Sequence, residues 1–279
     1  CKDCGRQFVI IRGKNNLRNK LWQEYVWGKQ TLNQLGDKYR RSPRWVRRQI
    51  DAHQLEKKKV RISKIVAIAD ATFFSRGYGI LVFRCPHSKR NIYLKEIVTE
   101  KVDDYLQAKL FLEQKGFVFE AMVVDGRRGL FNVFADMPVQ MCHFHQIAIM
   151  RRYLTSRPQL EAGKELRAIT FTLTISSEKS FTDLLTVWHE KWKGFLKEKT
   201  YSLDKKHWQY THRRIRSAYR SLNTSLPYLF TYQKHPRLKI PNTTNSLDGF
   251  FSKLKSLVNV HKGLSPKRRL KLIREILFP

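Results

Sequence analysis

Three observations predict an α/β fold for this chain. Between residues 64 and 154, short apolar runs of strand length alternate with segments of helical periodicity. On both sides of this region the periodicity is mainly helical. The chain has 279 residues, of which 42% are hydrophobic. It can therefore build one large domain or two to three smaller ones, each with its own hydrophobic core.

The elements of the central region follow a definite order. Strands are predicted over residues 65–72, 78–85 and 91–98, with turns at Gly77 and at residues 86–88 between them. They are followed by a helix (102–116), a strand (118–124), a short helix (127–134), a short strand (138–142) and a helix (143–154). This order is that of a ribonuclease-H-like fold, so we expect a mixed sheet flanked by helices.

Residues 155–240 interrupt this fold, and we predict that they form a mostly helical insertion. The segment is rich in large aromatic residues, namely Trp188, Trp192, Trp208, Tyr210, Tyr219 and Tyr228. These side chains would form either a local core or platforms on which bases stack, and we favour the core. A basic helix over residues 205–220, which includes Arg213 and Arg214, is the stronger candidate for binding nucleic acid.

Residues 14–53 predict three helices, the last two arranged as a helix-turn-helix. Leu32, Leu35 and Tyr39 share one helical face. Ser42 is a favourable N-cap, and Pro43 suits the first position of the next helix. We therefore place the start of the second helix of the motif at Pro43.

The second helix of this motif carries a cluster of arginines. Trp45, Val46 and Ile50 would pack inward, which leaves the arginines on the outer face, and these are Arg44, Arg47 and Arg48. An ordinary three-helix bundle with a basic face would show the same pattern. We favour DNA binding, because the arginines lie on the helix that would enter the major groove.

The charge of the chain predicts a polyanionic partner. There are 55 Lys and Arg residues against 23 Asp and Glu, a formal net charge of +32. Nucleic acid is the first candidate, and an anionic membrane surface is the alternative. No window of about 20 apolar residues predicts a transmembrane helix, and we expect no membrane partner. Only four cysteines are present, which favours a reducing compartment such as the cytoplasm.

Cys1 and Cys4 have the spacing of half a zinc ribbon. Two thiolates can hold a Zn²⁺ ion, but tetrahedral coordination needs two more ligands, and no second CxxC follows. We expect the other ligands to lie upstream of Cys1, in a part of the protein that this chain does not include. The predicted organisation is a zinc-ribbon remnant (1–13), a helix-turn-helix domain (14–60), a first part of the core (61–154), the insertion (155–240), and a last helix with a basic segment (241–279).

Three acidic residues are candidates for a catalytic metal site. Asp70 ends the apolar run KIVAIAD, Asp125 ends FEAMVVD, and Asp248 lies at the start of a predicted helix over 245–258. In the predicted topology the strands that carry Asp70 and Asp125 are parallel neighbours, so their carboxyl ends meet. Mg²⁺ prefers oxygen ligands and is held by one or two carboxylates with several waters. Carboxylates that hold two such ions are the basis of metal-dependent phosphoryl transfer.

Each of these residues also has a simpler interpretation. Asp125 and Gly126 would form a plain turn after a buried strand. Asp248 lies three residues after Asn245 and would complete a capping box. Asp70 is the hardest to explain in this way, because its neighbours are apolar and an unpaired buried carboxylate is costly.

Four motifs together resemble those of a known family. IADATFF, VVDGRRGLF, CHFH and NTTNSLDGFFSKLK, in this order, are similar to the Mutator-like group of bacterial insertion-sequence transposases, of the DDE/D type. The resemblance extends from Lys64 to Lys262, and the half zinc ribbon and helix-turn-helix before it also fit. It implies a ribonuclease-H-like catalytic core with an all-helical insertion before the last acidic residue. It also implies DNA strand cleavage and joining that depend on two Mg²⁺ or Mn²⁺ ions.

The resemblance assigns roles to individual residues. Asp70 and Asp125 match the first two catalytic acids, and Asp248 stands where the family usually has Glu, one methylene longer. Cys142 and His145 match the Cys-x-x-His motif. These two share a helical face, and His145 would contact the scissile phosphate or orient a ligand. Cys142 itself would pack as a small apolar residue.

Further candidate ligands and basic residues lie near these motifs. A zinc site that joins Cys142 and His145 to Cys85 and His87 is not expected, because the turn at Pro86 would lie at the opposite end of the sheet. Arg127 and Arg128 would either bind phosphate oxygens or cap the short helix in solvent. Lys253 and Lys255, on the last predicted helix, complete the candidate DNA contacts.

The sequence therefore leads to the expectation of a transposase that cuts DNA at transposon ends and joins them to target DNA. Its partners would be the terminal inverted repeats and the target duplex. Because two ends must be cut together, we expect a homodimer or a larger assembly on DNA. The alternatives are a DNA-binding regulator that has lost catalysis and a structural protein that binds nucleic acid through charge alone.

Overall fold

The computed structural model describes residues 12–55, 64–202 and 206–278. Cys1, Cys4 and the basic residues 57–59 lie outside these ranges. The chain divides into two compact units, one made of residues 1–60 and 249–279 and the other of residues 61–248. Two segments from opposite ends of the sequence therefore build the first unit together.

The first unit contains the predicted N-terminal helices. They are α1 (Arg12–Val26), α2 (Leu32–Tyr39) and α3 (Pro43–Ala52). The start predicted for the third helix is confirmed, because Ser42 accepts a hydrogen bond from the backbone N of Trp45 and Pro43 occupies the first turn. Val46 and Ile50 are fully buried, and Trp45 is half-buried. The apolar face of α3 is thus the one that the sequence predicts.

The C-terminal helix α12 (Pro266–Leu277) is bound to α3 by polar contacts. The guanidinium of Arg268 donates two hydrogen bonds to the carboxylate of Asp51, each 2.7 Å long. Lys271 Nζ donates to the carbonyl of Ile50 at 2.6 Å and also to that of His53. In the same unit, the rings of Tyr25 and His261 stack with centroids 3.9 Å apart. These contacts explain why the two ends of the chain form one unit.

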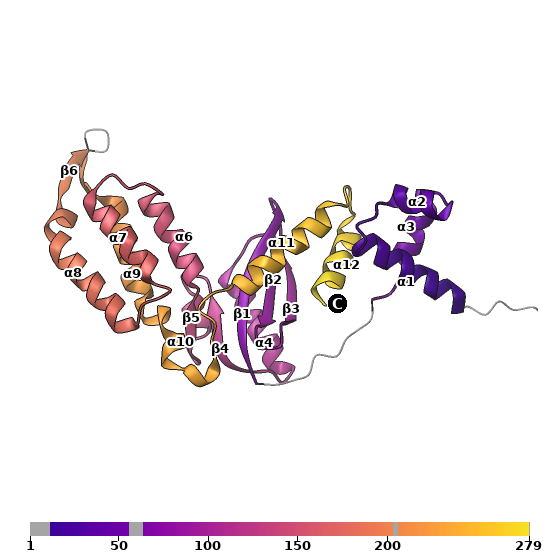
Figure 1. The fold of residues 1–279 in the computed structure, drawn as a ribbon, viewed down its shortest axis with the longest axis horizontal. Coiled ribbons are helices and arrows are strands. Elements are labelled where there is room, and N and C mark those ends of the chain that lie inside the picture. Colours follow the sequence, from indigo (N-terminus) through magenta and orange to yellow (C-terminus); the bar gives the residue numbers. More distant parts are fainter. Residues whose placement is uncertain (1–11, 56–63, 203–205, 279) are drawn as a thin grey trace, which may run out of the picture. The chain divides into compact units, whose positions relative to one another are not determined.

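The second unit is built on a five-stranded mixed sheet with the strand order β3-β2-β1-β4-β5 (Figure 1). The strands are β1 (Lys64–Ser75), β2 (Tyr78–Cys85), β3 (Arg90–Ile97), β4 (Val118–Val124) and β5 (Val139–Met141). β1, β2 and β3 form an antiparallel meander, whereas β1, β4 and β5 are parallel. The helices α4 (Val102–Gln114), α5 (Leu130–Val133) and α6 (His143–Leu154) follow the order predicted from the sequence. The predicted α/β class and the helices that flank a mixed sheet are confirmed.

The largest difference from the predicted strand bounds is at the end of β1. β1 extends to Ser75, so Asp70 lies within the strand rather than at its end. The cause is the antiparallel partner β2, which pairs with β1 as far as Ser75 and Tyr78 and returns through Gly77 with a φ of +77°. The parallel pairing with β4 stops earlier, at Ile68 and Val123. Asp70 therefore lies just beyond the point where β1 loses its parallel neighbour.

The insertion is mostly helical but contains a β-hairpin. Its helices are α7 (Glu161–Thr172), α8 (Glu178–Lys197), α9 (Arg213–Leu229), α10 (Thr231–Lys234) and the 3₁₀ helix η1 (Pro236–Leu238). Between α8 and α9 the strands β6 (Lys199–Ser202) and β7 (His207–Tyr210) pair antiparallel. The mostly helical insertion read from the residues is confirmed, whereas the all-helical insertion implied by the resemblance is wrong. The basic helix begins at Arg213 rather than at residue 205. Alternating Tyr, Trp and Thr side chains favour strand over helix here.

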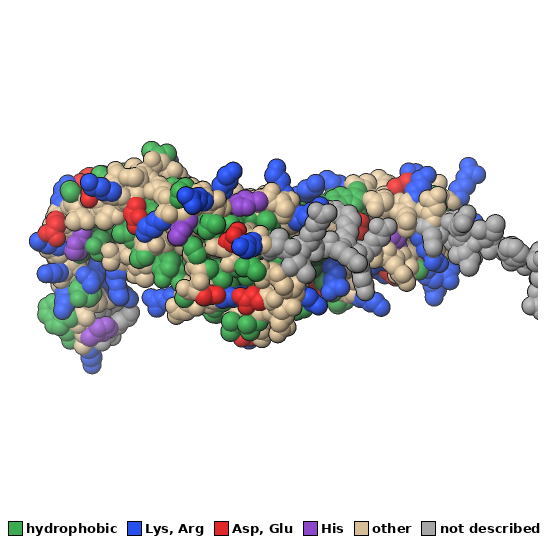
Figure 2. Space-filling model, turned by 90° about the horizontal axis from the view of Figure 1, so that it is seen from below, with side chains coloured by type: hydrophobic (Ala, Val, Ile, Leu, Met, Phe, Trp, Pro, Cys, Tyr) green, Lys and Arg blue, Asp and Glu red, His purple; other side chains and the backbone are tan. Residues whose placement is uncertain are grey.

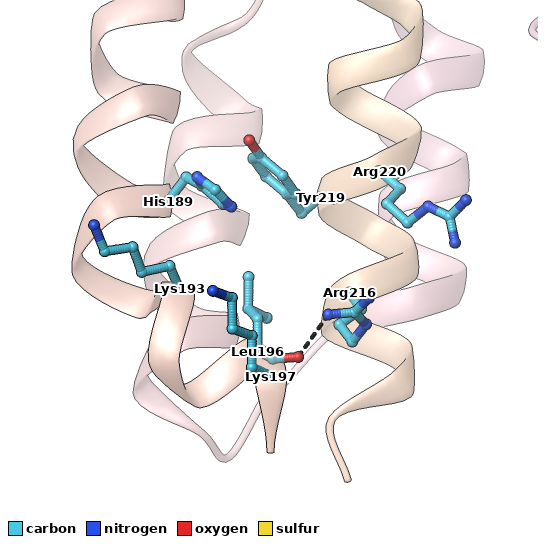
Figure 3. Close-up of a pocket in the computed structure, with 7 residues that line it drawn as sticks. All are labelled: His189, Lys193, Leu196, Lys197, Arg216, Tyr219 and Arg220. Carbon is cyan, nitrogen blue, oxygen red and sulfur yellow. Dashed lines mark hydrogen bonds between the residues drawn. The ribbon is translucent and has the colours of Figure 1, made fainter. Parts of the chain in front are cut away.

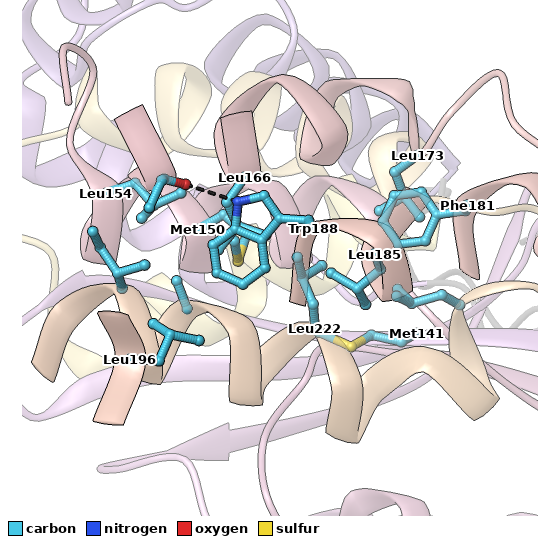
Figure 4. Packing of buried hydrophobic residues seen from close by; sticks show 14 of the residues in the cluster. Met141, Met150, Leu154, Leu166, Leu173, Phe181, Leu185, Trp188, Leu196 and Leu222 are labelled. Carbon is cyan, nitrogen blue, oxygen red and sulfur yellow. Dashed lines mark hydrogen bonds between the residues drawn. The ribbon is translucent and has the colours of Figure 1, made fainter. Parts of the chain in front are cut away.

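The helices of the insertion share a hydrophobic core with α6 and with Met141 of β5 (Figure 4). Trp188 of α8 is only 2% exposed and donates a hydrogen bond from Nε1 to the carbonyl of Ala162 in α7 at 3.0 Å. Trp192, Tyr219 and Tyr228 pack against the same core. The interpretation of the aromatics as core is confirmed for these four residues. It is wrong for Trp208 and Tyr210, which are 65% and 38% exposed on β7.

Among the helices that the structure describes, none has both the length and the apolar character that crossing a membrane would require.

The contrast between Trp188 and Trp208 gives a stability prediction. Trp188→Ala should lower the free energy of unfolding by about 3–5 kcal/mol, because it opens a cavity and leaves the Ala162 carbonyl without its partner. Trp208→Ala should change it by no more than about 0.5 kcal/mol, since this side chain is exposed. Urea unfolding followed by circular dichroism would measure both. Equal destabilisation by the two variants would contradict the core described above.

Candidate active site

The strand register brings Asp70 and Asp125 to the same edge of the sheet. Ile68 pairs with Val123, and continuing this register by two residues sets Asp70 beside Asp125. β4 ends at Val124, so Asp125 is the first residue after the strand, as predicted. The next parallel strand ends nearby, since the backbone N of Cys142 donates to the carbonyl of Val124 at 2.9 Å. Because parallel strands end at one edge of a sheet, three segments converge here.

Asp70 is the most deeply buried of the three predicted acids. Its side chain is buried, with only 8% of the residue exposed, and Oδ1 accepts a hydrogen bond from the backbone N of Ala71 at 2.8 Å. Burial raises the pKa of this carboxyl to about 7, although the neighbouring charge of His145 acts in the opposite direction. The charges of Asp248 and Asp125 raise the pKa further. The three predicted acids are thus close enough to interact electrostatically.

Asp125 and Asp248 are half-buried beside Asp70. Oδ1 of Asp125 accepts a hydrogen bond from the backbone N of Arg127 at 3.1 Å. Asp248 lies in the first turn of α11 (Asn245–Asn259), where its Oδ2 accepts a hydrogen bond of 3.4 Å from the hydroxyl of Thr244. Asn245 is the first helical residue, so a capping box with Asn245 as its N-cap does not form.

Cys142 attaches the segment before α11 to the sheet. Its Sγ lies 3.3 Å from the hydroxyl oxygen of Thr244 and accepts a hydrogen bond of the same length from the backbone N of Thr244. The backbone N of His143 donates to the carbonyl of Asn242 at 2.9 Å. Cys142 and Thr244 are both fully buried. These contacts place Asp248 near Asp70 even though 178 positions separate them in the sequence.

His145 lies one helical turn after Cys142 and contributes a positive charge. The neighbouring thiol of Cys142 is the main reason that the pKa of His145 is raised, to about 9, and the charges of Asp70 and Asp125 act in the same direction. At neutral pH this imidazole is therefore protonated. Burial would raise the pKa of Cys142, but the neighbouring His145 and Thr244 outweigh burial and leave it lowered. Nδ1 of His145 is buried and has no hydrogen-bond partner in the described part of the chain.

Of the two arginines that follow Asp125, one is already neutralised. Arg127 forms an ion pair of 2.6 Å with Glu100 and donates a second hydrogen bond to the carbonyl of the same residue. Glu100 also accepts a hydrogen bond of 2.6 Å from the hydroxyl of Tyr105, which is buried. Arg127 thus joins a structural network instead of capping the helix in solvent. Arg128 is exposed, so it is the arginine available to a phosphate.

The remaining basic candidates are distributed over both units. Arg44, Arg47 and Arg48 are exposed on α3, as predicted. Arg213 and Arg214 begin α9 and donate hydrogen bonds to Gln209 and to the carbonyl of Arg152. Lys253 and Lys255 lie on the part of α11 that belongs to the first unit. Figure 2 shows Lys and Arg side chains spread over the visible face rather than gathered into one patch.

The arrangement of the acidic side chains can be compared with what the expected metal ions require. Among the described residues, no group of three or more His, Cys, Asp or Glu side chains is arranged to hold a metal ion. A Mg²⁺ ion needs only one or two carboxylates, because waters complete its octahedron. Asp70 and Asp125 supply two carboxylates at one sheet edge. Burial is the main cause of the raised pKa of Asp70, and the charge of His145 opposes it.

Cys85 and His87 lie far along the sheet from this edge. Cys85 ends β2, two residues beyond Phe83, whose β1 partner is Ala69. The hairpin that contains both residues therefore lies toward the start of β1. Nε2 of His87 is 3.1 Å from the carbonyl oxygen of Lys239. The expected separation of these residues from Cys142 and His145 agrees with the strand register.

Two residues of the site were missed in the sequence. Thr244 anchors the loop before α11, and Glu100 neutralises Arg127. The pair of threonines in NTTNSLD preceding the helix is a signal for a cap at Thr244. Glu100 has no comparable signal, because its partner lies 27 residues away and belongs to another loop.

Comparison with models of protein families finds no match to this chain, and no curated protein is significantly similar to it.

The buried carboxyl of Asp70 predicts a pH-dependent stability. Its pKa is 3.8 in the unfolded chain and about 7 in the folded one. The contribution of Asp70 to the free energy of unfolding is fully present below about pH 4. It is lost as the pH rises from about 4 through 7, by about 1.4 kcal/mol for each pH unit. Asp70→Asn should therefore stabilise the chain relative to the parent by about 4 kcal/mol more at pH 8 than at pH 4.

Urea unfolding of both proteins at the two pH values, with a chelator present, would measure this difference. Asp183→Asn, at an exposed position on α8, is the matched control for the loss of one charge. If the difference in free energy of unfolding between Asp70→Asn and the parent is the same at pH 4 and pH 8, Asp70 does not titrate as a buried carboxyl.

Proposed function

We propose that the chain is a DNA transposase of the metal-dependent, three-carboxylate type, with a ribonuclease-H-like core. The observation that carries the proposal is the buried carboxylate of Asp70, whose pKa is raised to about 7 beside Asp125, Asp248 and His145. Nothing in the packing of β1 requires an acid at this position, where an apolar residue would cost less. The strand order and the four motifs that resemble Mutator-like transposases support the same function.

The acids have distinct positions in this proposal. Asp70 and Asp125 would hold the divalent ions, and Asp248 would complete the site from α11. When bound, a pair of Mg²⁺ ions supplies a nucleophile at neutral pH and stabilises the attacking and leaving oxygens. The strands fix both carboxylates before DNA arrives, so little reorganisation is needed at the time of reaction.

His145 would contact the DNA rather than a metal ion. Because its pKa is about 9, the ring is protonated at neutral pH and both nitrogens are donors. The half-buried ring would donate to a phosphate oxygen near the scissile bond. Arg128 would contact a neighbouring phosphate from the turn that follows Asp125. Together they would orient the phosphodiester for in-line attack, first by water and then by the 3′-OH that cleavage leaves.

The first unit would recognise the transposon end. α2 and α3 have the lengths and the cap of a helix-turn-helix, and Arg44, Arg47 and Arg48 are exposed on α3. Such a helix reads bases in the major groove, while arginines also hold phosphates. Cleavage of two ends together would require at least two copies of the chain on the DNA.

A second candidate is a DNA-binding regulator that has lost catalysis. Asp248 favours it, because the side chain is one methylene shorter than the usual Glu and its carboxylate is already hydrogen-bonded to Thr244. The regulator would retain the exposed arginines of α3 and all DNA binding.

Metal binding separates the two candidates. Calorimetric titration with Mn²⁺ in the presence of a DNA duplex should show binding to the parent and its loss in Asp70→Asn/Asp125→Asn. The reason is that the variant keeps the shape of both side chains but removes both charges. The matched control Asp103→Asn/Asp183→Asn removes two exposed carboxylates and should bind as the parent does.

Strand cleavage of the same duplex should be lost in Asp70→Asn while DNA binding is retained. Equal weak Mn²⁺ binding by the parent and the double variant would overturn the enzyme and leave the regulator.

A further inference from the structure

One face of the hairpin β6–β7 presents aromatic side chains to solvent. Tyr201 and Trp208 are cross-strand partners, and Lys199 pairs with Tyr210. Because side chains alternate along a strand and partners share a face, these four residues lie on the same side of the hairpin. Tyr201 and Trp208 are 43% and 65% exposed, and their rings meet edge to face. The opposite face carries Thr200 and Gln209.

This aromatic face leads to a cationic pocket at the end of the hairpin. The ring of Tyr210 lies under the guanidinium of Arg216, which is 3.5 Å from the ring centroid. Arg216 also donates a hydrogen bond of 2.7 Å to the carbonyl of Leu196 and lines a pocket of about 230 Å³ between α8 and α9. Tyr210 therefore joins the exposed rings to the pocket.

The pocket is lined by basic side chains from both helices. Figure 3 shows His189, Lys193 and Lys197 on one helix, and Arg216, Tyr219 and Arg220 on the other. Lys193 is paired with Glu190. Lys197 and Arg220 are exposed and form no ion pair within the described part of the chain. Among the described residues, those that line the pocket include no acid. Two cations are thus available to an anion.

We propose that the hairpin and this pocket form one contact for DNA with unpaired bases, in which a base stacks on Trp208 and a nearby phosphate enters the pocket. The inference rests on the proposed function, since strand cleavage and joining at a DNA end expose unpaired bases. Exposed aromatic rings bordered by basic side chains are the usual platform for unpaired bases, because every base has a π-face.

The spacing suits a short stretch of nucleic acid. Trp208 and Tyr210 are two residues apart on one strand, a distance of about 7 Å. The guanidinium of Arg216 lies over the face of the Tyr210 ring, 3.5 Å from its centroid. The spacing of about 7 Å between Trp208 and Tyr210 corresponds to roughly two nucleotide steps of about 3.4 Å each.

Charge decides between nucleic acid and a second copy of the chain as the occupant of this face. The hairpin and the helix ends beside it carry exposed cations, namely Lys197, Lys199, Lys206, Arg213 and Arg220. The one acid among the described residues here, Glu198, is held by His212 at 2.8 Å. Two such faces would repel each other, whereas a phosphodiester chain would be attracted.

Binding of the full chain to labelled DNA would test the proposal. Three probes are compared by fluorescence anisotropy, namely a duplex, the same duplex with a three-nucleotide unpaired flap, and the single strand. Trp208→Ala should weaken binding to the flap and the single strand about ten-fold, since a stacked base contributes that much, and leave duplex binding within about two-fold. Trp208→Phe should restore most of the loss. Ile175→Ala, at an exposed apolar position of the same insertion, is the control.

The pocket is tested by its salt dependence. Lys197→Gln/Arg220→Gln should weaken binding to all three probes and lower the slope of log K against log salt by about 2, one for each lost phosphate contact. Arg157→Gln/Lys179→Gln, at exposed positions elsewhere on the insertion, should keep the parental slope. Inorganic phosphate should compete only at concentrations far above that of the DNA. Competition at equal concentrations would assign the pocket to a free anion and overturn the proposal.

Three outcomes distinguish failure of this inference from failure of the proposed function. If the parent cleaves DNA but Trp208→Ala binds the flap as the parent does, only the inference fails. If Trp208→Ala instead lowers self-association in sedimentation experiments without DNA, the face belongs to a second copy and the inference also fails. If the parent binds none of the probes, both fail.

Discussion

The parallel pairing of β1, β4 and β5 is the constraint on which the rest of the candidate site depends. It aligns Ile68 with Val123 and Val124 with Met141. This single register therefore sets the positions of Asp70, Asp125 and Cys142. β1 alone continues past this point because β2 still pairs with it. The carboxylate of Asp70 is therefore carried by a paired strand of the sheet rather than by a loop. A rigid strand fixes a ligand more accurately than a loop does, and the cost is the burial of a charge.

The same end of the sheet also holds the insertion in place. Thr231 donates to the carbonyl of Val139 at 2.6 Å, and the side-chain amide of Gln140 donates to that of Leu229 at 2.9 Å. His143 Nε2 lies 2.6 Å from the same Leu229 carbonyl oxygen. The return of the chain from the insertion is thus attached to β5 and to the start of α6. Loop closure becomes only slowly more costly with length, so a large insertion is tolerated once its ends are fixed.

The elements formed by local pattern could be predicted from the sequence, and those fixed by distant partners could not. Tyr78–Cys85, Val118–Val124 and His143–Leu154 have the predicted bounds, because apolar runs and turn residues delimit them. The length of β1 depends on its partner β2, and the sequence of β1 does not encode it. The position of Asp248 depends on a contact between Cys142 and Thr244, which are 102 residues apart. The hairpin in the insertion was missed because its short strands lie between long helical patterns.

Under the proposed function, the charge of the chain would link metal binding to DNA binding. At +32, the protein repels divalent cations at long range, and an exposed carboxylate elsewhere is already compensated by nearby Lys or Arg, as Glu165 is by Lys191. The acids around Asp70 have His145 as their cationic neighbour, and its charge also opposes a metal ion. A DNA phosphate that binds His145 and Arg128 would reduce this positive potential at short range, where salt does not screen it. The carboxylates would then gain affinity for metal ions when the substrate is in place, which would confine the proposed chemistry to the protein–DNA complex.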